Sequence, residues 1–102
     1  MQTLHYQFPA DRVPNRRVHV GVVGSGDLEI LLTEPAAGQD RADVRVRTSV
    51  DGFDTIWKAT LERFFSQSAL RGCWELNDFG ATPGVVTLRL RQVVESAMED
   101  QP

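Results

Sequence analysis

The chain begins with an alternation of apolar and polar residues that predicts a β-strand. Leu4, Tyr6 and Phe8 are separated by single polar residues, and the pattern stops at Pro9. A period of two places the apolar side chains on one face of a strand. Because proline has no N–H to donate to a neighbouring strand, we expect this strand at an edge of its sheet.

Two further alternating segments flank a glycine-rich turn and predict a β-hairpin. Every second position is apolar in residues 18–22 and again in residues 28–32, and Gly24-Ser25-Gly26-Asp27 lies between them. Glycine adopts the positive φ values of a tight turn at no steric cost. We expect the first strand to run from Arg17 to Val23, with Ser25 at the tip of the hairpin.

The second half of the chain predicts a strand, a helix, a strand and a second helix. Alternation predicts a strand over residues 44–50, and apolar spacing predicts an amphipathic helix over residues 53–66. Residues 73–76 form one more short strand. Thr82-Pro83 then favours a helix start, because threonine is a good N-cap and proline suits the first helical position. The alternation after Pro83 also fits a strand, but the cap favours a helix with these apolar residues on one face: Val86, Leu90, Val93, Val94 and Ala97.

The element order β-β-β-β-α-β-α predicts an α+β fold. Its expected form is a small antiparallel sheet with two helices on one face, because that arrangement buries both helical stripes against the inward face of the sheet. The 102 residues contain no repeat or linker and form a single expected domain, residues 1–102. A domain of this size has little room for a deep pocket of its own, which counts against a self-contained enzyme.

Charge and hydropathy exclude several classes of partner. The 11 Lys and Arg residues against 14 Asp and Glu residues give a net charge of −3, so we expect no binding to nucleic acid. No apolar stretch approaches the ~20 residues of a membrane helix, and the first residues do not resemble a signal peptide. Cys73 is the single cysteine, so no internal disulfide is possible. A cytoplasmic protein is the expectation.

The candidates for nucleophilic catalysis or metal binding are few. Gly24-Ser25-Gly26 lacks the outer glycines of the Gly-x-Ser-x-Gly motif, and a hairpin is not the strand-to-helix turn that this motif requires. Cys73, beside Trp74, is interpreted as a buried structural thiol. His5 and His19 are interpreted as surface residues, because no further ligands stand at a recognisable spacing. We therefore expect no catalytic residue and no metal.

The remaining charged residues are interpreted as solvated side chains. Asp27 and Glu29 flank Leu28 on the same face of a strand, as an acid–base pair would, but strand charges explain them equally well. The same interpretation applies to four arginines: Arg45, Arg47, Arg89 and Arg91. Residues 21–26 do not form a phosphate-binding loop, because the glycine order is wrong and no helix or lysine follows.

Ser25 is the unusual feature that remains. Two glycines flank it and Asp27 follows, so little side-chain bulk obstructs its hydroxyl. Such a hydroxyl suits modification by another protein. From spacing alone, the favoured interpretation is still a glycine-rich turn in which the serine has no special role.

Three blocks of sequence together resemble a known family. They are residues 21–29 (GVVGSGDLE), residues 48–51 (TSVD) and residues 78–85 (DFGATPGV). They closely resemble the acyl carrier subunit (delta or C subunit) of biotin-independent malonate decarboxylase, and the likeness extends from Leu4 to about Ala97. The citrate lyase acyl carrier (gamma chain) is a more distant relative and the second choice within the class.

The resemblance implies a covalent prosthetic group on Ser25. In that family the matching serine is joined by a phosphodiester to 2′-(5″-phosphoribosyl)-3′-dephospho-coenzyme A, whose thiol carries acetyl and malonyl thioesters. Gly24 and Gly26 would expose the hydroxyl, and Asp27 would help to orient either this hydroxyl or the transferase that modifies it. The pattern departs from that of ordinary acyl carriers, which are helical bundles with Asp-Ser-Leu at a helix start, so an ordinary phosphopantetheine arm is not expected.

The resemblance also implies a non-catalytic carrier with several enzyme partners. These are the acyltransferase that exchanges acetyl for malonyl, the decarboxylase subunits and the transferase that attaches the prosthetic group. We expect the loop from Asp78 to Gly84 to lie near Ser25 and to help form the surface that partners recognise. The alternative from another class is a small interaction or regulatory domain with a modifiable Ser25 loop. A free-standing hydrolase with Ser25 as nucleophile lacks a base and an acid at a suitable spacing.

Overall fold

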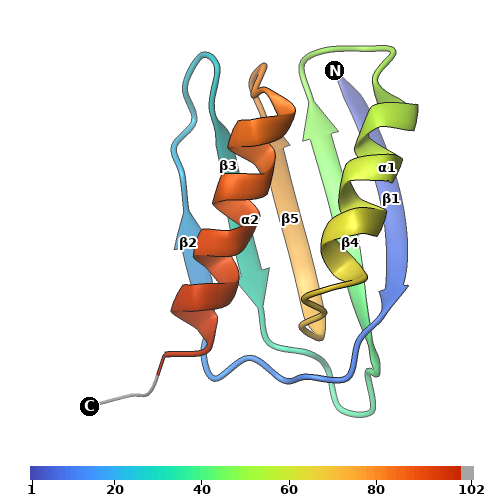
Figure 1. Ribbon diagram of the computed structural model, residues 1–102, viewed down its shortest axis with the longest axis vertical. Helices are drawn as coiled ribbons and strands as arrows, with labels where there is room; N and C mark the ends of the chain where they lie inside the picture. Colours follow the sequence, from blue (N-terminus) through green and yellow to red (C-terminus); the bar gives the residue numbers. More distant parts are fainter. Residues whose placement is uncertain (100–102) are drawn as a thin grey trace.

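Two helices cover one face of a five-stranded sheet (Figure 1). The computed structural model describes residues 1–99. The strands are β1 (Gln2–Pro9), β2 (Val18–Val20), β3 (Leu28–Thr33), β4 (Arg41–Thr48) and β5 (Gly72–Asp78), and the helices are α1 (Asp54–Phe65) and α2 (Pro83–Ala97). The strand order in space is β1-β4-β5-β3-β2, with β1 at an edge. The predicted α+β class and the element order are confirmed.

The sheet is mixed, whereas an antiparallel sheet was predicted. β4 and β5 are parallel, and the other three neighbouring pairs are antiparallel. The reason is the helix between them. α1 carries the chain back to the end of the sheet where β4 begins, so β5 runs in the same direction as β4 and pairs with it directly. Apolar alternation indicates that a strand has a buried face but does not identify its neighbour.

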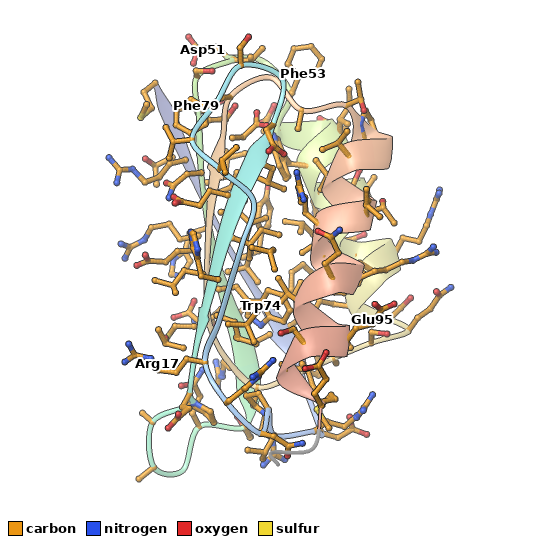
Figure 2. All side chains as sticks on the ribbon, turned by 90° about the vertical axis from the view of Figure 1, so that its left-hand side faces the viewer. Arg17, Asp51, Phe53, Trp74, Phe79 and Glu95 are labelled. Atoms are coloured by element: carbon orange, nitrogen blue, oxygen red, sulfur yellow. The ribbon has the colours of Figure 1, made fainter. Side chains whose placement is uncertain are left out.

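The core lies between the sheet and the helices, as Figure 2 shows for Trp74. In β3, β4 and β5 every second residue points inward and is buried, whereas the inward residues of β1 are half-buried. Leu61 of α1 and Leu90 of α2 are fully buried. Trp74 packs edge-on against Phe65 with ring centroids 5.1 Å apart, and its indole N–H donates to the carbonyl of Leu70 at 3.1 Å. The largest ring in the core is therefore buried without an unsatisfied polar group.

The start of α2 agrees with its prediction. Thr82 is the N-cap, and its Oγ1 accepts a hydrogen bond from the backbone N–H of Val85 at 3.3 Å, with Pro83 in the first turn. Val86 and Leu90 are buried on the side that faces the sheet. The helix interpretation is therefore confirmed against the alternative of a strand. In residues 1–99, neither helix has the length and apolar character needed to cross a membrane.

Candidate functional site

Ser25 lies at the tip of the β2–β3 loop, which is longer than predicted. β2 ends at Val20, not Val23, because Gly21 has a φ of +80° and turns the chain away from the sheet. A β-carbon on Gly21 would lie 1.9 Å from the carbonyl oxygen of Leu28. Only a residue without a side chain therefore fits at this position. The close approach of Gly21 to the carbonyl of Leu28 fixes the base of the loop.

The tip is a tight turn with Ser25 in its second position. The N–H of Asp27 donates to the carbonyl of Gly24 at 3.0 Å, and Gly26 has a φ of +78°. Positive φ in the third position is typical of a type II turn, in which glycine is favoured. The predicted hairpin with Ser25 at its tip is confirmed.

The surroundings of Ser25 leave its hydroxyl accessible. Ser25 is exposed, and within residues 1–99 its side chain makes no hydrogen bond to another protein group. A β-carbon on Gly26 would meet nothing within 4 Å, and one on Gly24 would meet only Val22 at 3.7 Å. Neither neighbour of Ser25 has a side chain, and the space beside both neighbours is open as well.

Asp27 anchors the turn to α2. Its two carboxylate oxygens accept hydrogen bonds from the guanidinium of Arg89 at 3.0 and 2.9 Å, and one of them also accepts from the N–H of Leu28 at 2.7 Å. These bonds, with that of Arg89 first, hold the pKa of the Asp27 carboxyl below its ordinary value. The interpretation of Arg89 as a solvated charge is wrong, since this residue ties the loop to the helix layer.

The Asp27–Arg89 pair predicts a pH dependence of stability. The pKa of Asp27 is lowered by folding, so its contribution to the free energy of unfolding is present above the ordinary value of 3.8 and is lost as the pH falls through the lowered pKa. Arg89→Gln should therefore destabilise the protein at about pH 6 and much less at about pH 2.5. Urea denaturation at both pH values measures this difference. Arg91→Gln, which alters an exposed arginine on the same helix, is the control and should show no such dependence on pH. Equal destabilisation by Arg89→Gln at both pH values contradicts the assigned pairing of Arg89 with Asp27.

The loop between β5 and α2 lies beside the Ser25 turn. The N–H of Gly26 donates to the carbonyl of Phe79 at 2.7 Å, and the N–H of Phe79 donates to the carbonyl of Asp27 at 3.0 Å. The predicted proximity of residues 78–84 to Ser25 is confirmed. Figures 1 and 2 show that the β4–α1 connection, with Asp51 and Phe53, lies at the same end of the molecule. The three blocks of sequence that carry the family resemblance therefore meet at one end.

A buried polar pair holds two of these segments together. Thr48 is fully buried, Asp78 is 3% exposed, and the hydroxyl of Thr48 donates to the carboxylate of Asp78 at 2.8 Å. The other carboxylate oxygen accepts from the N–H of Ala81 at 2.9 Å. Buried polar groups that are hydrogen-bonded in this way fix the conformation of their loops. Asp78 therefore has a structural role beneath the surface of the site.

The other acidic and histidine candidates do not join Ser25. Glu29 points to the uncovered face of the sheet, where it accepts hydrogen bonds from His19 at 2.9 Å and Asn77 at 3.0 Å, and these bonds lower its pKa. Asp27 is turned toward α2, so the prediction that Asp27 and Glu29 lie on the same face of the strand is wrong. His5 is exposed and pairs with Asp43. Within residues 1–99, no group of three His, Cys, Asp or Glu side chains is arranged to hold a metal ion.

Cys73 is exposed, whereas a buried thiol was predicted. It is paired in register with Asp43 and lies on the open face of β5, while Trp74 points into the core. The alternation of a strand places adjacent residues on opposite faces, so the burial of Trp74 itself requires Cys73 to face outward. The general tendency of free cysteine to be buried was outweighed by strand register.

The exposed thiol predicts rapid modification of the folded protein. Because no conformational opening is needed to reach Cys73, a small disulfide reagent should react with the native chain at about the rate seen for the urea-denatured chain. Release of the coloured thiolate from the reagent measures both rates. A native protein that reacts only after unfolding contradicts the exposed position of Cys73.

Comparisons with known proteins agree on one family. The model of the family "Malonate decarboxylase delta subunit (MdcD)" matches residues 15–97. The chain is 46% identical over 101 residues to the malonate decarboxylase acyl carrier protein of Pseudomonas savastanoi pv. phaseolicola, covering 98% of this chain and 100% of the relative. It is 47% identical over 98 residues to the protein of the same name from Azotobacter vinelandii, covering 93% and 95% of the two chains.

A solved structure has the same fold. A chain in the crystal structure of a Pseudomonas malonate decarboxylase hetero-tetramer in complex with malonate superposes with a TM-score of 0.87 at 43% identity, covering 95% of this chain and 99% of that one. The α+β fold of this chain is thus shared with a chain of that assembly, and the relatives similar in sequence are acyl carrier proteins. This chain belongs to the malonate decarboxylase delta subunit family.

The sequence alone does not indicate that Arg89 and Gly21 are part of the site. Arg89 lies between Val86 and Leu90 in the predicted helix, which places it beside the buried face. The sequence, however, does not indicate that Asp27 is its partner. Gly21 opens the first matching block, and only the structure shows that the carbonyl of Leu28 fills the space of its side chain.

Proposed function

We propose that this chain is the acyl carrier subunit of a malonate decarboxylase and that Ser25 is the point of attachment of its prosthetic group. The observation that carries the proposal is the exposed hydroxyl of Ser25 on an open turn, in a chain of the malonate decarboxylase delta subunit family. A transferase that brings a bulky phosphate donor to this hydroxyl meets no side chain on either neighbouring residue.

The residues around Ser25 fit 2′-(5″-phosphoribosyl)-3′-dephospho-coenzyme A as the attached group. Ser25 would hold it through a phosphodiester, and the open space beside Gly24 and Gly26 would accommodate it. The group supplies a terminal thiol on which acetyl and malonyl residues are held as thioesters. Both oxygens of Asp27 are bonded to Arg89, so we assign Asp27 to holding the turn in place and not to activating the serine.

In the proposed mechanism, the carrier contributes position and its partner enzymes contribute the chemistry. The carboxylate nearest to Ser25 in the sequence, that of Asp27, is bonded to Arg89, and Ser25 lies at the surface. Tethering raises the effective concentration of the acyl group at each partner's active site. The partners proposed are an acyltransferase that exchanges acetyl for malonyl, the decarboxylase subunits and the transferase that attaches the group, all in the cytoplasm.

Reconstitution tests this function. The chain is purified from a bacterium that contains the whole malonate decarboxylase system and is then mixed with partner subunits that lack it. We expect no release of carbon dioxide from malonate by either part alone and full release by the mixture. The Cys73→Ser variant should restore turnover as well as the wild type, because the acyl group is not carried on this thiol. Turnover by the isolated chain, or by partners without it, contradicts the proposal.

A further inference from the structure

An apolar cavity lies at the same end of the molecule as Ser25. Its volume is about 320 Å³, and it opens between α1, the end of β4 and the start of α2. Its apolar walls come from two regions that are distant in the sequence, residues 50–57 and residues 83–86: Val50, Phe53, Ile56, Trp57, Pro83 and Val86. The cavity is close to the lower limit of ordinary ligand pockets, so it fits a small ligand or one end of a longer one.

The cavity is adjacent to the Ser25 turn through the β5–α2 loop. Gly26 and Phe79 are joined by a backbone hydrogen bond, and Gly80 and Ala81, the next residues, line the cavity. Consecutive Cα atoms are 3.8 Å apart and hydrogen-bonded strand neighbours about 5.5 Å apart, so the Cα atoms of Ser25 and Gly80 are at most about 13 Å apart. A group of the length of dephospho-coenzyme A attached to Ser25 reaches this distance easily.

The mouth of the cavity exposes apolar side chains to solvent. Phe53 is 44% exposed, Ile56 47% and Val50 37%, although all three line the same hollow. Exposed apolar side chains gathered around a hollow are typical of a site that is covered by a ligand or a partner. A tethered ligand has an advantage over a free one, because its effective concentration at the mouth is in the millimolar range for a short flexible link.

The polar groups of the cavity wall disfavour an anion. Asp78 lines the cavity, and none of the ion pairs within residues 1–99 involves its carboxylate. A second carboxylate brought into the same apolar space loses its hydration and is repelled. A malonyl group ends in a free carboxylate, whereas an acetyl group is uncharged. The cavity chemistry therefore distinguishes the two acyl groups.

We propose that this cavity shelters the uncharged acetyl thioester end of the prosthetic group attached to Ser25, and that it excludes the malonyl form. The inference rests on the proposed function of Ser25 and adds a second binding site on the carrier itself. Val50, Ile56 and Val86 contact the acetyl end, and the carboxylate of Asp78 rejects the malonyl carboxylate. The carrier thus shields one acyl form and leaves the other exposed to the decarboxylase.

Methyl NMR of the isolated, fully loaded carrier tests the inference. Intact mass first establishes that each sample carries the group on every molecule. We expect the methyl resonances of Val50, Ile56 and Val86 to shift in the acetyl form relative to the unmodified chain. In the malonyl form, these resonances should lie at their positions in the unmodified chain. Ile56→Glu, which places a charge at the half-exposed mouth, should abolish the shifts, whereas Leu88→Glu on the exposed side of α2 should retain them.

Cleavage of the thioester by hydroxylamine gives an independent measure. A cavity occupied for three quarters of the time leaves one quarter of the acetyl thioester accessible and slows cleavage about fourfold relative to Ile56→Glu. Equal rates and unshifted methyl groups in a fully loaded carrier overturn the inference and leave the proposed function intact. Shifts that appear only after partner enzymes are added, or that are the same for acetyl and malonyl, overturn it as well. A chain that never acquires the group overturns both proposals.

Discussion

Replacing Ser25 with alanine is expected to abolish malonate turnover by the reconstituted complex while leaving the fold of the carrier unchanged. Ser25 is exposed and its side chain makes no hydrogen bond to residues 1–99, so the substitution removes no packing and no buried partner. It removes the one oxygen to which we assign the prosthetic group. Carbon dioxide release from labelled malonate should fall to the level of partner subunits without any carrier, with an unchanged midpoint of thermal unfolding.

Ser49→Ala is the matched control. Ser49 is exposed at the same end of the molecule, next to the loops that flank the cavity, and its hydroxyl makes no hydrogen bond within residues 1–99. This variant should support malonate turnover at the wild-type rate. A Ser25→Ala carrier that sustains turnover, or a Ser49→Ala carrier that does not, contradicts the assignment of Ser25.

Gly21→Ala is expected to have the largest effect on stability. A β-carbon at Gly21 would lie 1.9 Å from the carbonyl oxygen of Leu28, and the φ of +80° is itself unfavourable for alanine. Either the loop or the start of β3 must move, which separates β2 from β3 at the edge of the sheet. We expect the free energy of unfolding to fall by about 3 kcal/mol and the midpoint of thermal unfolding by roughly 15 °C.

Gly38→Ala separates the two causes of that loss. Gly38 has a nearly identical φ of +79°, but a β-carbon there would meet nothing within 4 Å. Its substitution should therefore cost only the backbone strain, about 1 kcal/mol. Chemical denaturation of both variants measures the difference. Equal losses at the two positions contradict the role of the Leu28 carbonyl in requiring glycine at Gly21.

The parts of the fold that were predictable depend on local chemistry. The alternation before Pro9 gives β1 and its edge position, and the Thr82-Pro83 cap gives the start of α2. Each of these features is decided by residues within a few positions of one another. The parallel pairing of β4 and β5 is a property of the whole topology, because it depends on which strand lies beside which after α1 has crossed the sheet.

The errors at single residues have a common cause. The predicted burial of Cys73 used the average behaviour of cysteine, while the strand register set by Trp74 decided its face. Arg89 was assigned to solvent because its partner, Asp27, is distant in the sequence and joins it only when α2 packs over the loop. In both cases a tertiary constraint overrode the preference of an isolated residue type.

The candidate site was predictable in part. The glycines around Ser25 predict an accessible turn, and the structure confirms both the turn and the neighbouring position of the β5–α2 loop. The attachment of a prosthetic group was suggested by family resemblance and stays a proposal. The cavity had no sequence signal, because its walls combine Val50, Ile56 and Val86 from segments whose meeting depends on the complete fold.

The most direct test of the central claim is a peptide mass map of the carrier purified from a bacterium that contains the whole malonate decarboxylase system. Cleavage after Arg17 and Arg41 releases residues 18–41, in which Ser25 is the only serine. The account predicts that this peptide carries the full mass of the phosphoribosyl-dephospho-coenzyme A group and that fragmentation places it on Ser25. The contradicting result is an unmodified peptide from an active complex, or the added mass on a peptide that contains one of the other serines: Ser49, Ser66, Ser68 or Ser96.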